Sequence, residues 1–295
     1  MMVILTIAST LCLFSQTRSI SHKLSPFTGI EATDEFKVSI TKSDDYLAKL
    51  TIDDDLESYV QCYVKGGVLH IGLDEKKVPK DLKKKYKARN SNGPTLVANV
   101  QLPLLKSLTL QDEAEFSCAG EIASQDLTFN LGGSSSAGKL RITGKTFKLT
   151  VDKNARFLES RVTVEDDLII SCDSKGKADI EYRAENLQVD NGGSGEVVLK
   201  GSADQKVSVN ASGSSKTTLS GSSDKLDVAG KGSSASVDAS SLEVDSASLS
   251  ISGMSASVKA RKNLELDLGR GAEVSFSGNP EINIVKIQSA SVLRK

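Results

Sequence analysis

The sequence predicts an all-β protein, a parallel β-helix (solenoid) of about ten short coils. Two observations carry this prediction. A pair of apolar residues separated by one outward-facing residue keeps returning along the last two thirds of the chain, and clusters of Gly and Ser lie between the returns. Alternation with a period of two is typical of a strand, and small residues at fixed intervals are typical of stacked corners.

The apolar pairs begin near residue 107 and recur about every 19 residues. They are Leu108 and Leu110, Leu127 and Phe129, Leu149 and Val151, Leu168 and Ile170, Leu187 and Val189, Val207 and Val209, Leu226 and Val228, Leu249 and Ile251, Leu264 and Leu266, and Ile282 and Ile284. Stacking such coils places each inward side chain on its counterpart in the next coil, roughly 4.8 Å away. A right-handed helix is expected, because parallel strands joined by crossovers favour that hand.

Each coil is expected to hold at least two strands, because a second alternating pair follows about ten residues after the first in many repeats. Examples are Ile180 and Tyr182, Val197 and Leu199, Val237 and Ala239, and Val274 and Phe276. The segments 192–195 and 212–215 are corners, since glycine supplies the positive φ angles that sharp turns need.

Two other folds compete with the solenoid. Residues 191–260 resemble a disordered Ser/Gly-rich linker, and an antiparallel barrel or sandwich would also have many short strands. A linker has no reason to keep Leu-x-Val at intervals, and an antiparallel fold lacks the fixed period. The parallel solenoid is therefore favoured.

Residues 26–106 are expected to form the entry to the solenoid, and residues 107–295 its repeats. Strands are expected at 36–40, 47–52, 59–64, 68–73 and 96–100, with a hairpin turn at Lys65, Gly66 and Gly67. This segment would cap the first coil, which otherwise exposes unpaired backbone groups.

A basic stretch at 76–89 interrupts the entry segment. Its cations are Lys76, Lys77, Lys80, Lys83, Lys84, Lys85, Lys87 and Arg89. The stretch could bind acidic polysaccharide or lipid headgroups, but a solvated short helix or loop is the favoured interpretation.

Residues 1–19 are predicted to be a signal peptide, with cleavage near Thr17 to Ser19. The apolar run from Val3 to Phe14 has the length of a signal-peptide core and is too short to span a bilayer. The alternative is a buried N-terminal strand. Cys12 follows Ser9, Thr10 and Leu11, which make a poor lipoprotein cleavage box. Because the apolar run has the length of a signal-peptide core, we expect the protein to be exported. No integral membrane span is expected after removal of the leader.

The charge balance and the cysteine spacing argue against several classes of protein. The 37 basic and 38 acidic residues give a net charge of -1, so nothing favours a nucleic-acid partner. Cys62, Cys118 and Cys172 lack the spacing of a zinc or redox site and are too few for a disulfide scaffold. Each is expected to be a small buried hydrophobe, and at least one thiol must be free or paired between chains.

No catalytic, cofactor-binding or metal-binding residue is predicted, and no cofactor. Histidine chemistry has only His22 and His70 to use, and His70 is expected to be a strand side chain. The segment 192–196 resembles the start of a calcium-binding nonapeptide, with Glu where Asp is expected. The motif occurs once and does not repeat every nine residues, so a calcium β-roll is rejected. The acidic sets at 112–115 and 165–167 are expected at strand ends and corners as solvated charge. Their members are Asp112, Glu113, Glu115, Glu165, Asp166 and Asp167.

The chain resembles the family of auto-transporter adhesin head GIN domains over roughly residues 26–294. The matching positions are Phe27, Gly29, Ile30, Phe36, Val38, Ile40, Leu69, Ile71, Leu102, Pro103, the returning Gly/Ser corners, Gly278, Asn279, Pro280, Ile282 and Ile284. The resemblance implies an exported cell-envelope protein with a β-helical fold and an adhesive role, and offers no catalytic residues to carry over. The basic insert and the charged corner at 152–161 depart from the family pattern and leave the ligand open.

Three functions follow, of which the first is favoured. A non-catalytic surface or periplasmic module would present its flat, Ser/Thr/Lys-rich strand faces to a glycan or a protein. A polysaccharide-acting enzyme would need carboxylates and a basic residue converging in one cleft. A self-assembling envelope protein would pair coil ends or sheet edges, although Arg294 and Lys295 disfavour end-to-end growth.

Overall fold

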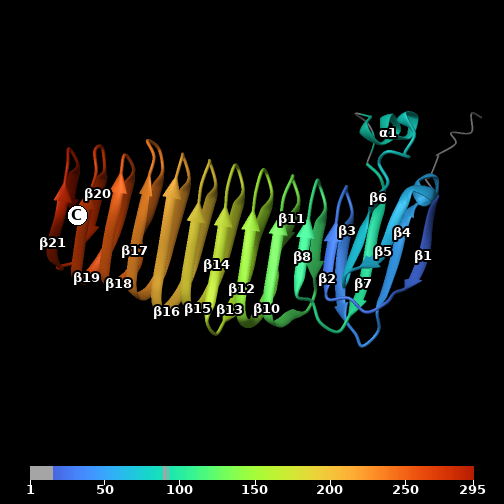
Figure 1. Ribbon diagram of the computed structural model, residues 1–295, viewed down its shortest axis with the longest axis horizontal. Coiled ribbons are helices and arrows are strands. Elements are labelled where there is room, and N and C mark those ends of the chain that lie inside the picture. The colour runs from blue at the N-terminus through green and yellow to red at the C-terminus, as the bar shows by residue number, and fades with distance from the viewer. Residues whose placement is uncertain (1–15, 89–90, 92) are drawn as a thin grey trace, which may run out of the picture.

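The structure is a computed structural model that describes residues 16–88, 91 and 93–295. With 67% of residues in strands and 5% in helices, it forms a β-solenoid of about nine turns (Figure 1). The predicted β-helix of about ten coils is confirmed. The apolar run of the expected leader, Cys12 and Arg89 lie outside the described residues.

The described residues up to 106 contain seven strands and two short helices, and all but the first strand lie in the entry segment 26–106. These are β1 (Thr17–Lys23), β2 (Gly29–Ala32), β3 (Lys37–Lys42), β4 (Leu47–Asp53), the 3-10 helix η1 (Asp54–Tyr59), β5 (Val60–Lys65), β6 (Val68–Leu73), α1 (Lys80–Lys87) and β7 (Leu96–Leu102).

The remaining fifteen strands stack along the solenoid. These are β8 (Ser107–Leu110), β9 (Glu115–Cys118), β10 (Glu121–Leu131), β11 (Ser136–Gly138), β12 (Arg141–Val151), β13 (Arg156–Val164), β14 (Asp167–Cys172), β15 (Lys177–Asn191), β16 (Glu196–Ser212), β17 (Lys216–Lys231), β18 (Ser236–Ser252), β19 (Ser255–Leu268), β20 (Glu273–Ser277), β21 (Glu281–Ile287) and β22 (Ser291–Arg294).

Neighbouring coils pair in parallel, with like positions of the repeat in register. Leu127 and Phe129 of β10 lie beside Phe147 and Leu149 of β12, and the same register continues through β16 and β17. Residues 191–260, where a linker was the alternative, run through β15 to β19. The parallel pairing likewise excludes an antiparallel sandwich for residues 107–295.

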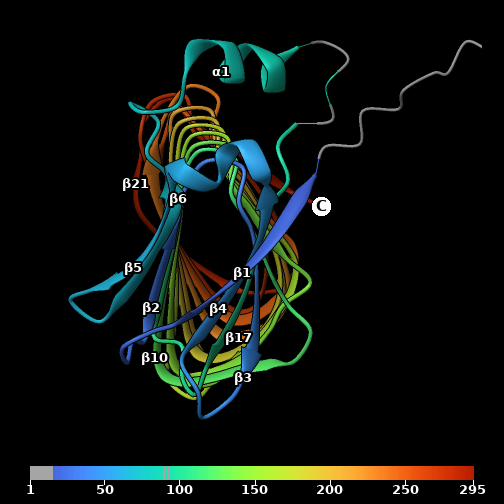
Figure 2. The ribbon, with the colours of Figure 1, turned by 90° about the vertical axis from the view of Figure 1, so that its right-hand side faces the viewer.

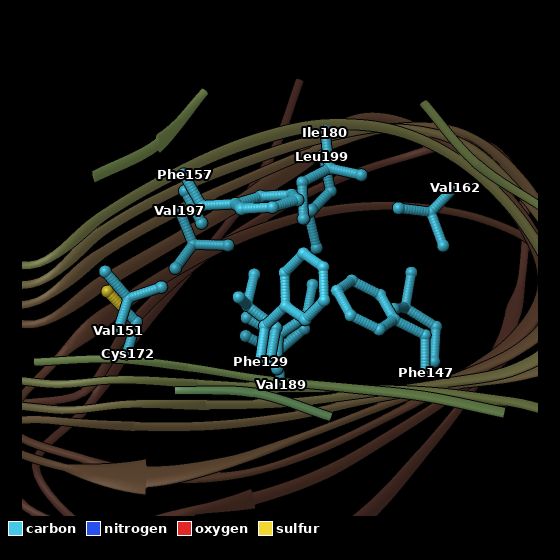
Figure 3. Close-up of a cluster of buried hydrophobic side chains, with 14 of the residues drawn as sticks. Phe129, Phe147, Val151, Phe157, Val162, Cys172, Ile180, Val189, Val197 and Leu199 are labelled. Carbon is cyan, nitrogen blue, oxygen red and sulfur yellow. The ribbon is translucent and has the colours of Figure 1, made fainter. Parts of the chain in front are cut away.

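The core runs through the interior of the coils and is mostly aliphatic. Its main aromatic cluster is formed by Phe129, Phe147 and Phe157, whose ring centroids lie 5.3 to 6.2 Å apart (Figure 3). Cys172 and Val189 point into the same interior from following coils (Figure 3). Since each short strand has one apolar face, stacking the coils is what buries it.

One corner of nearly every coil holds a residue with positive φ, and these corners stack in a row. The members are Asp34, Asp112, Gly133, Lys153, Ser174, Gly193, Gly213, Gly253, Gly271 and Ser289, with φ between 50 and 72°. Just beyond this corner, a small residue is buried in most coils, such as Ala114, Ser135, Ala155 and Ser215. The predicted corners at 192–195 and 212–215 belong to this row.

The entry segment caps the solenoid, as expected. β2 and β3 stack in parallel on β8 and β9 and form the first coil. On their other side lie β6 and β7, followed by the β5–β6 hairpin and by antiparallel β4 and β1. β1 runs across this end of the solenoid, and η1 lies at its upper edge (Figure 2). Leu56 of η1 is buried. Thr17 to Ser19, where leader cleavage is expected, form part of β1 and pair with β4.

Candidate binding surfaces

Outward side chains of the coils form rows, because the parallel register repeats every position. On several faces these rows carry ion pairs between adjacent coils: Arg161 to Glu181 at 2.6 Å, Lys177 to Glu196 at 2.5 Å, Lys206 to Asp227 at 2.6 Å and Arg261 to Asp245 at 2.5 Å. Exposed pairs of this kind each stabilise a protein by less than about 1 kcal/mol. Their main effect here is to neutralise charge along those faces.

One row differs because it contains neither a cation nor an apolar side chain. We call it the polar row; it consists of Thr109, Asn130, Thr150, Ser171, Asp190 and Asn210, on β8, β10, β12, β14, β15 and β16. In the same register, Glu31 of β2 precedes the row and Ala229 of β17 follows it. With coils about 4.8 Å apart, six members span roughly 24 Å.

A shallow groove of about 450 Å³ lies along the polar row and the adjoining corners. It is lined by four members of the row and by Asp152 and Asp173. The Ser174 hydroxyl donates a 2.8 Å hydrogen bond to Asp152, which lowers the pKa of that carboxyl. The groove therefore offers hydroxyl, amide and carboxylate groups, and its surface is acidic to neutral.

A second hollow, the N-terminal cleft, lies between α1 and the first corners of the solenoid and has a volume of about 390 Å³. Its polar lining includes the carboxylates of Asp34, Glu35, Glu75, Asp112 and Glu113 and the side chains of Lys83, Lys87 and Tyr86. Leu56, Leu73, Val78 and Leu96 supply apolar walls. Carboxylates and lysines thus converge here from segments far apart in the sequence.

Two of these carboxylates are part of the corners themselves. Asp34 accepts hydrogen bonds from the Leu73 amide at 2.7 Å and the Thr33 hydroxyl at 2.8 Å, and burial nonetheless raises its pKa. Asp112 accepts a long bond of 3.4 Å from the Asp34 amide. For Glu35, burial and the nearby charge of Glu113 raise the pKa, while Lys87 opposes them.

The basic stretch forms α1, which η1 tethers. Asp55 of η1 accepts hydrogen bonds from Lys85 at 2.6 Å and from the Tyr86 hydroxyl at 2.5 Å. Burial favours the neutral form of Asp55, but these two bonds outweigh it and lower its pKa. Within the described residues, no acid lies within 4.0 Å of the Lys80 or Lys84 ammonium. The stretch is therefore a short exposed helix, as favoured from the sequence.

The acidic sets that the sequence singled out are divided among several places. Asp112 and Glu113 line the N-terminal cleft, whereas Glu115 points outward from β9 toward Lys37, 3.8 Å away. Glu165 lines a different groove together with Arg183.

The other two acids of the second set have partners of their own. Asp166 lies 3.4 Å from Lys145, and Asp167 accepts a hydrogen bond from Asn186 at 3.1 Å. Sequence spacing gave no signal for Asp34, Glu35 or Glu75, which only the fold brings to the cleft.

Histidine and cysteine residues make structural contacts. His70 is a strand residue of β6, stacked on Tyr63 at 5.0 Å and 3.3 Å from Glu31. Cys172 is buried, and Cys62 and Cys118 are half-buried, all three as free thiols. Burial raises the pKa of Cys62 and Cys172 to about 11, so both stay protonated near neutral pH. No group of His, Cys, Asp or Glu among the described residues could hold a metal ion.

The chain is therefore a capped β-solenoid, with the polar row on one face and the N-terminal cleft at the cap. The family described as "Putative auto-transporter adhesin, head GIN domain" matches residues 26–160 and, as a second copy, 136–280. The chain belongs to this family, which confirms the resemblance noted in the sequence. No helix within the described ranges has the length and apolar character needed to cross a membrane.

Solved structures to which the chain is similar include proteins of Parabacteroides and Bacteroides species. One described as a "putative lipid binding protein" of Parabacteroides distasonis is 18% identical, covers 95% of this chain and 96% of its own, and gives a TM-score of 0.44. A "putative adhesin" of Parabacteroides merdae is 17% identical with the same coverage and TM-score. A "putative adhesin" of Bacteroides fragilis is 14% identical, covers 96% and 98%, and gives 0.36. No curated protein matches the chain significantly.

Proposed function

We propose that the protein is a non-catalytic, exported module of the cell envelope that binds a glycan along the polar row. The observation that carries this proposal is the register of the row: six successive coils each present one hydrogen-bonding side chain at the same place. Membership of an adhesin family supports the same function.

The chemistry of the row suits a neutral glycan. Sugar hydroxyls both donate and accept, so they match the hydroxyl, amide and carboxylate groups of Thr150, Ser171, Asp190 and Asn210. A single exposed hydrogen bond contributes only about 0.5–1.5 kcal/mol to binding, but several such bonds to one extended glycan chain add together. Since the row has no Lys or Arg, an anionic polysaccharide is disfavoured there.

The experiment measures binding of the purified protein to immobilised envelope polysaccharides, neutral and acidic. We expect the double variant Ser171→Ala/Asn210→Ala to bind a neutral polysaccharide at least tenfold more weakly than the parent. The matched control Ser202→Ala/Ser222→Ala changes two hydroxyls in register on β16 and β17, on a different face. Equal binding by both double variants would overturn the role of the row. Undiminished binding to envelopes after glycosidase treatment would identify a protein ligand instead.

The N-terminal cleft favours a second candidate function, a polysaccharide-acting enzyme. Glu35 has a raised pKa, as a general acid requires, and Glu113 and Lys87 lie close enough to shift it. The discriminating measurement is release of reducing ends from the polysaccharides that the protein binds. Turnover that Glu35→Gln and Glu113→Gln abolish would establish the enzyme. If binding persists in both variants and no reducing ends appear, the non-catalytic module is supported.

A further inference from the structure

The last coil of the structure concentrates exposed apolar side chains. Among the described residues, eight large hydrophobic side chains are exposed, and six of them belong to β21 and β22. They are Ile282, Ile284, Val285, Ile287, Val292 and Leu293, each between 37 and 62% exposed. The other two, Tyr63 and Val198, lie singly elsewhere. A grouped patch of this kind is typical of an interaction surface, whereas single exposed hydrophobics are ordinary.

Four of the six occupy core positions of the repeat. Ile282, Ile284 and Ile287 pair with the buried Leu264, Leu266 and Leu268, and Val292 pairs with the buried Val274. In every earlier coil such positions are covered by the following coil. Among the residues that the structure describes, β21 pairs with β19 alone and β22 with β20 alone, so one backbone edge of each strand is open there. The end therefore lacks both side-chain and backbone partners of the kind that a further layer of strands supplies.

The opposite end of the solenoid differs in character. There Leu56 of η1 packs into the core, and the outermost strand β1 carries Arg18, His22 and Lys23. A head-to-tail contact would place the apolar coil against this polar cap. A contact between two last coils instead covers both apolar patches at once.

We propose that the last coil docks on the last coil of a second copy, forming a closed, two-fold, tail-to-tail dimer. A two-fold axis perpendicular to the solenoid reverses strand direction, so β21 meets the partner's β21 antiparallel, and β22 likewise meets its counterpart. In that arrangement Glu281, at the start of β21, lies near the partner's Lys286, near its end. The contact covers six exposed apolar side chains on each copy, twelve in all. A specific interface buries at least about 1,000 Å² in total.

The test is the mass in solution, measured by sedimentation velocity across a wide concentration range. The purified chain is expected to be a dimer that dissociates on dilution and never exceeds two copies. Ile284→Lys and Leu293→Lys each change a side chain about 60% exposed, so the fold should persist, and each should weaken dimerisation at least tenfold. Val198→Lys, which changes an exposed apolar residue far from this end, is the matched control and should leave the dimer intact.

A charge exchange tests the antiparallel register itself. Glu281→Lys and Lys286→Glu should each weaken the dimer, because like charges then face each other, and the double variant should restore it. A monomer at all concentrations would overturn the proposal, as would open-ended growth beyond two copies. Glycan binding by the polar row is independent of these results, since its members lie on β8 to β16.

Discussion

The stacked corners depend on a backbone conformation that few residues adopt without cost. Gly213 has a φ of 70°, and a Cβ atom there would lie 2.6 Å from the carbonyl oxygen of Gly193 in the preceding coil. Lys153 and Ser174 take the same conformation in neighbouring coils despite their side chains. Non-glycine residues pay roughly 1–2 kcal/mol for it, which the surrounding stack must offset.

We expect Gly213→Ala to lower the free energy of unfolding by about 1–3 kcal/mol, through strain and the close approach to Gly193. The matched variant Lys153→Gly relieves the strain of a positive φ but raises the conformational entropy of the unfolded chain. Because the two effects oppose each other, the free energy of unfolding should change by no more than about 1 kcal/mol. Urea unfolding of both variants checks the pair. If Gly213→Ala proved as stable as the parent, positive φ would not be required at that corner.

A buried polar contact links two coils inside the solenoid. The Asn191 side-chain amide donates to the Thr217 hydroxyl at 2.9 Å and to the Lys216 carbonyl at 3.0 Å. We expect Asn191→Ala to cost about 1–3 kcal/mol, because it leaves buried acceptors without a donor. In a double-mutant cycle with Thr217→Val, a coupling of at least about 0.5 kcal/mol is expected. Strict additivity would show that the contact contributes nothing specific.

At the residue scale, the sequence predicts the apolar positions of the core better than the corners. Leu-x-Val spacing identifies inward side chains directly, since strand geometry fixes their direction. Lys153 and Ser174 have no strong preference of their own for a positive φ. The hydrogen bonds from their amides to Asp152 and Asp173, and the stacking of the coils, hold them in it. The N-terminal cleft is equally hidden, because Asp34 and Asp112 become neighbours only when the first two coils stack.

At the scale of elements, Asp55 of η1 links the cap to α1 through its hydrogen bonds with Lys85 and Tyr86. The pKa of Asp55 is lowered, so its contribution to docking is complete above the ordinary value of 3.8 and is lost as pH falls through the lowered value. We expect segment 80–87 to exchange amide hydrogens faster in strong acid, after correction for intrinsic rates. Asp55→Asn should show that faster exchange already at neutral pH.

The matched control for this tether is Glu57→Gln. Glu57 belongs to the same helix η1, but its partner is Arg18 of β1 rather than α1. Exchange in α1 should therefore be unchanged in this variant. Equal loosening of α1 by both variants would show that the stability of η1, and not the Asp55 contacts, controls docking.

In the entry segment, the spacing of the sequence repeat does not predict which strands belong to the coils. Its hairpin is predicted by Lys65, Gly66 and Gly67, because consecutive positive φ angles suit a tight turn. The first coil is not visible in the same way. Ile30 stacks beside Leu108, but the long insertion between β3 and β8 removes the regular spacing. Only the parallel pairing in three dimensions reveals that β2 and β3 continue the repeat.

For the whole molecule, the linear stacking of coils predicts that local stability falls from the middle of the solenoid toward its ends. Each coil is supported only by its neighbours, so the middle coils should be the most protected and the ends the least. We expect amides of 281–294 to exchange fastest among the solenoid strands and those of 147–211 slowest. Exchange at 281–294 should slow as protein concentration rises, if the last coil dimerises. Uniform exchange along the stack would contradict a solenoid that opens from its ends.

The most direct test of the proposed function compares chemical labelling of carboxylates in the free protein and in the protein bound to a neutral envelope polysaccharide. One carbodiimide experiment measures the accessibility of Asp190 in the polar row and of Glu35 and Glu113 in the N-terminal cleft. If the polar row binds the glycan, labelling of Asp190 should fall severalfold while Glu35 and Glu113 label as in the free protein. Protection of Glu35 and Glu113 with Asp190 unchanged would contradict the proposal and place the ligand in the cleft.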